Sequence, residues 1–397
     1  MGRLTIEAAG FTLQTVRFSA QPLERWITSA KDAAEIAAEV GGQCVRAGMD
    51  YCSLGTIQAQ GRTGVGGLLV GGSSPNAQIS ELISAIPDML LAADNVYTSI
   101  QVGDRETGGI NLDAVRASAA VMKALSEKTA NGFGNLRFAA AANCPPHVPF
   151  FPVSYYTEDD RNEGAPEFGL ALEAADLAVQ AFSNAGTHEE ARENLLALLI
   201  ERGDLLAQVC GQLAASHGYN FTGLDISMAP FPETEKSIGR ALELISGGPM
   251  GGPGTLAAAT FFTGILKEAR RKLPTVGYSG LMLPVLEDQT LADRVAEGLV
   301  NLDTMLLLSA VCGLGIDTIP LPGDISVRQL EKIILDMASL AIRLDKPLSA
   351  RLFPVPGKAA GEPAEWPHFA YFARGRVMDV PGRGENAGLF RGSWLEV

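Results

Sequence analysis

Apolar residues along the chain change repeatedly between helical and strand-like spacing. Apolar side chains that recur every three or four positions predict helices, and short apolar runs bounded by Gly or Pro predict strands. The predicted helices cover residues 30–47, 79–93, 112–128, 165–183, 188–216, 236–245, 255–272, 291–297, 303–312 and 327–344. The predicted strands cover residues 11–18, 136–142, 148–154, 221–226, 276–285, 314–319, 348–355 and 370–377. Such alternation is typical of an α/β protein with helices outside a central sheet or barrel.

Two of the predicted strands carry a single carboxylate inside an apolar run. Asp225 interrupts the run 221–226 and Asp317 interrupts the run 314–319, and each acid is soon followed by two prolines. Burying an unpaired charge costs several kcal/mol, so a lone acid in a strand core is unusual. We therefore expect Asp225 and Asp317 to face a common interior cavity and to act in catalysis.

Further acids follow or end strand-like runs, and loops after barrel strands commonly meet at one mouth. Carboxylates combined with carbonyl groups and water bind hard cations such as Mg²⁺ or Ca²⁺. Glu233, Glu287 and Asp288 are accordingly predicted as metal ligands. The alternative is that Glu233 interacts with a helix N-terminus and that Asp324, another member of the acid set, caps a helix.

Two further side chains are candidates for nucleophilic or base chemistry. His147 follows Cys144 by three residues, so the two could form a nucleophile and its base, although two prolines separate them. A lone surface imidazole is the alternative for His147. Cys312 is the second catalytic candidate, but it precedes a Gly-Leu-Gly turn without a basic neighbour. A small buried apolar residue is the alternative there.

A glycine-rich turn at residues 247–255 precedes a predicted helix. Backbone amides at a helix N-terminus bind anions, so Gly251, Gly252, Gly254 and Thr255 are predicted to contact a carboxylate or phosphate of the substrate. The turn matches neither a Walker loop nor a dinucleotide fingerprint. Because its prolines lack amide hydrogens, a purely structural turn is the alternative.

Composition narrows the class of protein. The 397 residues are 47% hydrophobic, enough for a large core, and the net charge of −14 disfavours nucleic acid and anionic membranes as partners. Five cysteines without a Cys-x-x-Cys pair, together with the lack of an apolar leader or spanning segment, favour a cytoplasmic location. With only 19% charged residues, the apolar content predicts a homo-oligomer. Residues 1–380 are expected to form one domain, with 381–397 as a mobile tail or an arm.

Several ordered blocks carry a family resemblance. Residues 220–232, 280–288, 310–320 and 351–358 resemble successive blocks of the domain-of-unknown-function 711 family, also called the UPF0210 group. Members of that family are similar in fold to pyruvate formate-lyase and other glycyl radical enzymes. The resemblance implies a ten-stranded α/β barrel built of two half-sheets, with the helices outside and the site inside.

The resemblance does not extend to radical chemistry. Glycyl radical enzymes carry an Arg-Val-x-Gly-aromatic motif, whereas this chain reads Arg-Val-Met-Asp-Val over residues 376–380, with Asp379 in place of the glycine. No glycyl radical is therefore expected. Two hypotheses remain. One is a non-radical enzyme that performs carboxylate-based acid–base or hydrolytic chemistry on a small anionic metabolite. The other is a ligand-binding or regulatory barrel protein without catalysis.

Overall fold

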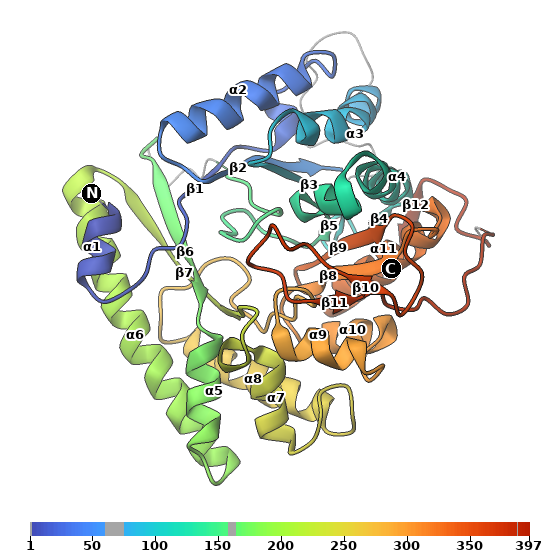
Figure 1. The fold of residues 1–397 in the computed structure, drawn as a ribbon. Helices are drawn as coiled ribbons and strands as arrows, with labels where there is room; N and C mark the ends of the chain where they lie inside the picture. Colours follow the sequence, from blue (N-terminus) through green and yellow to red (C-terminus); the bar gives the residue numbers. More distant parts are fainter. Residues whose placement is uncertain (1, 60–74, 158–163, 387) are drawn as a thin grey trace.

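A large mixed sheet forms the centre of the computed structural model, which describes residues 2–59, 75–157, 164–386 and 388–397 (Figure 1). Four neighbouring strands run parallel to one another, two further strands form a second parallel pair, and the two groups lie antiparallel where they meet. In spatial order the strands are β1 (Arg17–Ser19), β2 (Tyr51–Gln58), β3 (Val96–Asp104), β5 (Phe138–Ala142), β9 (Leu348–Val355) and β8 (Gly315–Pro322).

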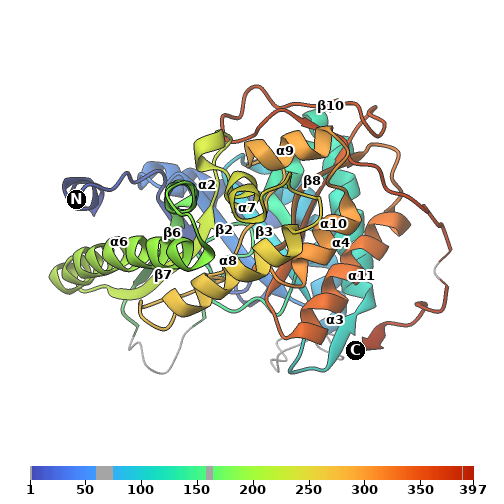
Figure 2. The same ribbon diagram turned by 90° about the horizontal axis from the view of Figure 1, so that it is seen from below.

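The central strands are covered on both faces. Every residue of β5, β8 and β9 is buried, which is the pattern expected when parallel strands have layers above and below them. Four helices pack on one face of the sheet and against one another, as the views in Figures 1 and 2 agree. They are α2 (Ala33–Arg46), α3 (Pro75–Ala92), α4 (Leu112–Lys128) and α11 (Val327–Leu344).

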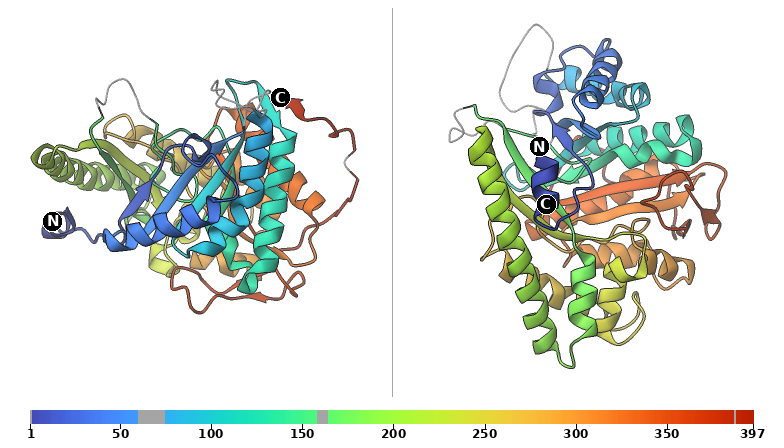
Figure 3. Two further views of the ribbon diagram at one scale, coloured as in Figure 1. Left: turned by 90° about the horizontal axis from the view of Figure 1, so that it is seen from above. Right: turned by 60° about the vertical axis from the view of Figure 1, so that its left-hand side comes forward.

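The other half of the molecule contains a two-stranded parallel sheet of β6 (Glu167–Glu173) and β7 (Asn220–Ala229). The long helix α6 (His188–His217) packs on β7, and the short N-terminal helix α1 (Gly2–Ala8) packs on α6 (Figure 3). The helices of this half are α5 (Ala175–Ser183), α6 (His188–His217), α7 (Ile238–Ser246), α8 (Thr255–Ala269), α9 (Gln289–Ala296) and α10 (Leu302–Ser309).

The segment between α8 and α9 lies between the two sheets. It makes one isolated parallel bridge from Thr275 to Leu224 of β7 and another from Pro284 to Asp317 of β8. The predicted strand 276–285 is therefore an irregular stretch with one bridge just before it and one near its end. Across the described residues the strand pairing does not close into a ring, so the ten-stranded barrel stays a prediction of the resemblance.

The C-terminal segment returns to the main sheet. Strand β12 (Trp394–Glu396) pairs antiparallel with β4 (Gly109–Asn111), and β4 pairs with β3. The end of the predicted tail thus lies as an arm along the chain's own sheet edge. Strands β10 (Pro363–Ala364) and β11 (Gly375–Arg376) form a separate short pair, and only β11 remains of the predicted strand 370–377.

Some predicted elements are wrong. Residues 165–183 form β6 followed by α5 where one helix was predicted, because residues 167–173 pair with the distant strand β7. Residues 148–154 form a bend-rich loop where a strand was predicted, and β2 and β3 were not predicted. Among the residues described, no helix has the length and apolar character needed to cross a lipid bilayer.

Candidate functional site

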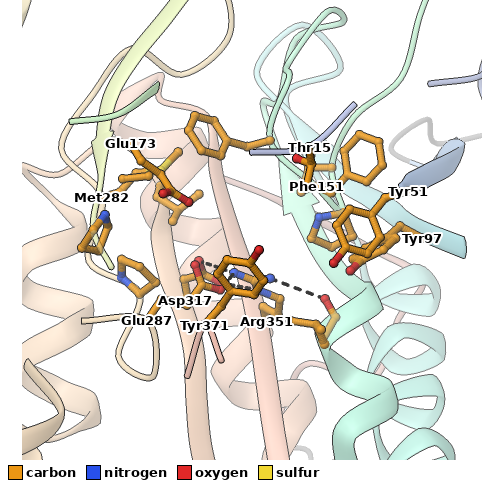
Figure 4. A pocket seen from close by; sticks show the side chains of 18 of the residues that line it. Thr15, Tyr51, Tyr97, Phe151, Glu173, Met282, Glu287, Asp317, Arg351 and Tyr371 are labelled. Atoms are coloured by element: carbon orange, nitrogen blue, oxygen red, sulfur yellow. Dashed lines mark hydrogen bonds and ion pairs between the residues drawn. The ribbon is translucent and has the colours of Figure 1, made fainter. Parts of the chain in front are cut away.

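A cavity of about 110 Å³ lies between the main sheet and the β6–β7 half of the molecule (Figure 4). Its walls come from the first residues of β1, β2 and β3, from β8 and β9, from the end of β6, and from residues 284–287 and 369–371. Along β9, Ser349 and Arg351 line the cavity while Ala350 and Leu352 lie in the core. This alternation follows from the two-residue period of a strand.

The cavity contains an arginine that is bound to two acids. Arg351 donates from Nε to Oδ1 of Asp317 at 2.5 Å and from Nη2 to Oδ2 at 2.8 Å. The same Nη2 donates to Oε1 of Glu287 at 2.7 Å. Burial by itself would lower the pKa of Arg351, but the charges of Asp317 and Glu287 together raise it, so the guanidinium stays charged. A two-point arginine–carboxylate contact also fixes the orientation of both groups.

Glu287 differs from Asp317 because only one of its oxygens has a partner among the described residues. Its side chain is 26% exposed and lines the cavity. Burial raises the pKa of Glu287 to about 7; Arg351 opposes this shift, while the charge of Asp317 adds to it. A carboxyl group that titrates near neutral pH can both accept and donate a proton under ordinary conditions.

A bulge in β8 aims Asp317 at the cavity. The pairing of β8 with β9 shifts register between Ile316 and Ile319. Within this interval Thr318 adopts a left-handed backbone with φ of 49°, which is uncommon for a β-branched residue. Bulges and strained residues of this kind occur next to functional sites, where they redirect a side chain.

The same bulge holds Glu287 in place. Val285 donates its amide to the carbonyl of Asp317 at 3.0 Å, and Leu286 donates its amide to Oγ1 of Thr318 at 3.0 Å. These bonds tie the chain just before Glu287 to β8. The position of Glu287 beside Arg351 therefore follows from backbone contacts and does not depend on the ion pair alone.

A second arginine lines the cavity without an acid partner in the described part of the chain. Nε of Arg17 donates to Oγ1 of Thr15 at 3.0 Å. The guanidinium carbon lies 5.7 Å from the ring centroid of Tyr51 and 5.4 Å from that of Phe151. Stacking on aromatic rings positions an arginine while leaving its terminal nitrogens available to an anion.

Asp225, predicted to share a cavity with Asp317, is not among the cavity residues. It is fully buried and accepts bonds from the amides of Ser227, Tyr278 and Ser279 at 3.1, 2.7 and 2.9 Å, and from the hydroxyl of Ser227. Burial raises the pKa of Asp225 to about 6, and these bonds oppose the shift. Its carboxylate thus joins β7 to the segment that carries Tyr278.

The predicted metal ligands do not come together. Asp288 is buried, caps α9 at the amide of Leu291, and also accepts from Ser237 and from the amides of Ile238 and Gly239. Burial raises the pKa of Asp288, against these bonds. Glu233 forms an exposed ion pair with Lys236, and Asp324 one with Arg383. In the ranges that the structure describes, no group of three or more His, Cys, Asp or Glu is placed to hold a metal.

Cys312 and His147 also lie outside the cavity lining. Cys312 is 1% exposed, belongs to the hydrophobic core and has its sulfur 4.0 Å from the carbonyl of Gly315, which matches the alternative of a small buried residue. His147 lies with Nδ1 3.3 Å from Oε2 of Glu167. Cys144 is buried, and burial raises its pKa to about 12, so its thiol stays protonated and unreactive.

The glycine-rich turn before α8 uses its amides within the turn. Gly251 donates to Oγ1 of Thr255 at 3.0 Å, and the amides of Gly252 and Thr255 turn back onto carbonyls of the same turn. The carboxylate of Glu243 accepts from the amide of Met250 in the same turn, and this negative charge disfavours an anion there. The predicted substrate contacts at Gly251, Gly252, Gly254 and Thr255 therefore lie in a structural turn away from the cavity.

Sequence reasoning placed Asp317 and Glu287 among the candidates and missed their partners. Arg351 lies in one of the family-like blocks, but its pairing with Asp317 depends on β8 and β9 being neighbours. Arg17 and Tyr97, which also line the cavity, have no local signal, since each is a single charged or aromatic residue near the start of a strand. A two-residue alternation of polar and apolar side chains in 348–352 was the one available clue.

Comparison with known proteins agrees with the resemblance in the sequence. A UPF0210 protein of Pyrobaculum arsenaticum is 30% identical over 360 residues, covering 89% of this chain and 76% of the relative. UPF0210 protein PAE3581 of Pyrobaculum aerophilum is 34% identical over 295 residues, covering 71% and 62%. A UPF0210 protein of Bifidobacterium longum subsp. infantis is 30% identical over 346 residues, covering 82% and 74%. The family profile described as "Uncharacterised ACR (DUF711)" matches residues 2–368, and the chain belongs to this family.

Proposed function

We propose that this protein is an enzyme that performs acid–base chemistry on a small metabolite, with Glu287 as the group that moves the proton. The observation that carries the proposal is the state of Glu287. It lines a cavity, its pKa is raised to about 7, and one of its oxygens is free of partners among the described residues. A general base must be partly ionised at working pH and must reach the proton that it takes.

Arg351 supports this chemistry by orienting Glu287. Its contact with Oε1 of Glu287 leaves Oε2 as the oxygen that would take a proton, either from a substrate carbon or from an attacking water. Once protonated, Glu287 would return the proton to carbon or to a leaving group. Asp317 acts as a positioning residue, because both of its oxygens bind Arg351.

The proposal includes a barrel around the cavity. Support comes from the two isolated bridges through which the segment 275–284 contacts both β7 and β8. Radical chemistry is not part of the proposal, since Asp379 stands where the glycyl radical motif has glycine. The Mg²⁺ or Ca²⁺ ion predicted from the sequence stays a prediction, and Glu287, the one predicted metal ligand in the cavity, is bound there by Arg351.

The test is a reaction screen in heavy water. Small carboxylates, esters and amides are incubated with the protein in D₂O, and proton NMR follows both carbon–hydrogen exchange and the appearance of hydrolysis products. We expect at least one compound to react, and Glu287→Gln to lower that rate at least about 100-fold. Glu233→Gln is the matched control, because Glu233 forms only an exposed ion pair. Equal rates in the wild type and Glu287→Gln, or no reaction at all, would contradict the proposal.

A ligand-binding protein without catalysis is the second candidate. It is favoured by the number of acids that are already satisfied: Asp225 and Asp288 are bound by amides and hydroxyls, and Asp317 is bound by Arg351. Such pairing would hold a barrel together without any proton transfer. Saturable binding of a compound that the screen shows to be stable would favour this second function.

A further inference from the structure

Two further charged residues line the cavity besides the cluster of Arg351, Asp317 and Glu287. Arg17 has no acid partner among the described residues, and Glu173 has one oxygen without a partner there. We propose that the cavity binds a small zwitterion of the amino-acid type, with its carboxylate on Arg17 and its ammonium group on Glu173 and the surrounding aromatic rings. The proposal rests on the same cavity as the proposed function and adds its substrate class.

Arg17 is the group suited to the carboxylate. The second cavity arginine, Arg351, already binds Asp317 through two bonds and Glu287 through a third, so its charge is neutralised within the protein. Arg17 donates only its Nε hydrogen to a neighbouring hydroxyl, and the rings of Tyr51 and Phe151 position its guanidinium. Its terminal nitrogens can therefore make the paired bonds that a carboxylate accepts.

Glu173 is the group suited to the ammonium. Oε1 accepts from Nε2 of Gln14 at 2.6 Å, and Oε2 has no partner in the described part of the chain. The register of β6 against β7 shifts at this point, with Met228 at φ of 55°, and leaves Glu173 opposite Ala229, which also lines the cavity. Burial raises the pKa of Glu173, while its bond from Gln14 and the charge of Arg17 oppose this shift.

The two groups lie on different walls. Figure 4 shows Glu173 beside Met282 on one side and Tyr51 and Phe151, the rings that stack on Arg17, on the other. A ligand with charge at one end only would leave one of the two groups without a partner. A molecule with a carboxylate at one end and an ammonium at the other would satisfy both.

Aromatic rings make the cavity favourable for a cation. Eight of its described lining residues are Phe or Tyr. One of them, Phe231, already has the ammonium of Lys236 4.9 Å from its ring centroid. Ring faces attract ammonium groups, and enclosed aromatic sites are a recurrent means of recognising them. A purely anionic ligand would gain nothing from these ring faces.

The test compares three matched series by isothermal titration calorimetry. The series are the amino acids alanine, serine and leucine, the hydroxy acids that replace the amine by hydroxyl, and the amines that lack the carboxylate. We expect at least one amino acid to bind roughly tenfold or more tightly than both of its counterparts, since each missing charged hydrogen bond lowers affinity by about that factor. Equal binding of the hydroxy acid, or no binding by any amino acid at millimolar concentration, overturns the proposal.

Variants assign the two contacts. Arg17→Gln should abolish the preference for amino acid over amine, Arg17→Lys should retain part of it, and Glu173→Gln should abolish the preference over hydroxy acid. Arg46→Gln and Glu39→Gln, which change an exposed ion pair on α2, are the matched controls and should bind as the wild type does. If either cavity variant keeps the wild-type preferences while its melting temperature is unchanged, the assignment is wrong.

This result is separable from the proposed chemistry. Glu287→Gln should still bind the amino acid while losing turnover. If the wild type binds the amino acid but never changes it, the zwitterion site stands and the acid–base function fails. If a compound without an amine is turned over through Glu287 and amino acids do not bind, the acid–base function stands and the zwitterion site fails.

Discussion

At the residue scale, the partners of each acid decide what the acid can do. Asp225 and Asp288 are saturated by amides and hydroxyls, and Asp317 is held on both oxygens by Arg351. Glu287 keeps an oxygen without a partner among the described residues and titrates near neutral pH. Sequence alone finds these acids because a carboxylate in an apolar run is conspicuous. It cannot separate them, since their partners come from distant strands.

The pH dependence of turnover follows from Glu287. As a base it must be ionised, and its pKa is raised to about 7 by burial. We expect the rate to rise about tenfold per pH unit below 7 and to level off above it. Initial rates between pH 5 and 9 on a substrate found in the screen would measure this. A rate that falls as the pH rises through 7 would mean that the protonated form of Glu287 acts first. A rate that does not change with pH would exclude Glu287 as the group that moves the proton.

Asp225 should contribute to stability in a pH-dependent way. Asp225→Ala leaves four donors without their acceptor, and we expect a loss of about 3 kcal/mol in the free energy of unfolding. The pKa is about 6 in the folded state and lower in the unfolded chain, so the folded state binds the proton more tightly. The contribution is therefore largest at low pH and falls as the pH rises through 6.

Urea unfolding at pH 5 and 7.5 would test this. The deficit of Asp225→Ala relative to the wild type should be larger at pH 5, by about 1 kcal/mol. Asp204→Ala, on the exposed side of α6, is the control and should behave as the wild type does at both values. A deficit that is equal or smaller at pH 5 would show that burial does not raise the pKa of Asp225.

At the element scale, local sequence patterns predicted several helices and strands well. No pattern in the sequence predicted which strands pair with one another. The helix 112–128 and the strand 348–355 have their predicted bounds. The helix begins where Asn111 accepts from the amides of the first turn, which is a local capping contact. Strand β6 was missed because its extended conformation depends on β7, about 50 residues later. The bulges in β7 and β8, which aim side chains at the cavity, leave no periodic signature either.

Gly277 is a position next to the cavity wall at which a single added methyl group should matter. Its φ is +66°, and an added Cβ would lie 2.2 Å from Oδ2 of Asp225. We expect Gly277→Ala to lower the free energy of unfolding by about 2 kcal/mol or more and to disturb Tyr278, which follows it in the cavity wall. Gly248→Ala is the matched control, because nothing lies within 4 Å of its added Cβ. Equal melting temperatures for the two variants would contradict this view of the 277–279 segment.

At the scale of the whole molecule, composition predicted a large hydrophobic core. The structure buries most of these apolar side chains within one chain. Apolar side chains such as Met282, Leu283 and Phe262 are buried within one chain, and Phe261 is partly buried. The general α/β class follows from alternating patterns. The sheet order β1–β2–β3–β5–β9–β8 does not, because the antiparallel contact of β5 with β9 joins segments about 200 residues apart.

The prediction of a homo-oligomer therefore depends on the apolar residues that remain exposed. Leu389 on the C-terminal arm is 97% exposed and Leu4 on α1 is 70% exposed. Exposed leucines are commonly covered by a symmetric partner when several lie together.

We expect light scattering at micromolar concentration to return a mass of at least twice the 41.8 kDa of one chain. Leu389→Asp should then lower that mass if the arm takes part, whereas Leu205→Asp on α6 serves as a control at another exposed leucine. A wild-type mass near that of one chain would rule the oligomer out, and β12 would then serve only to close the edge of its own sheet at β4.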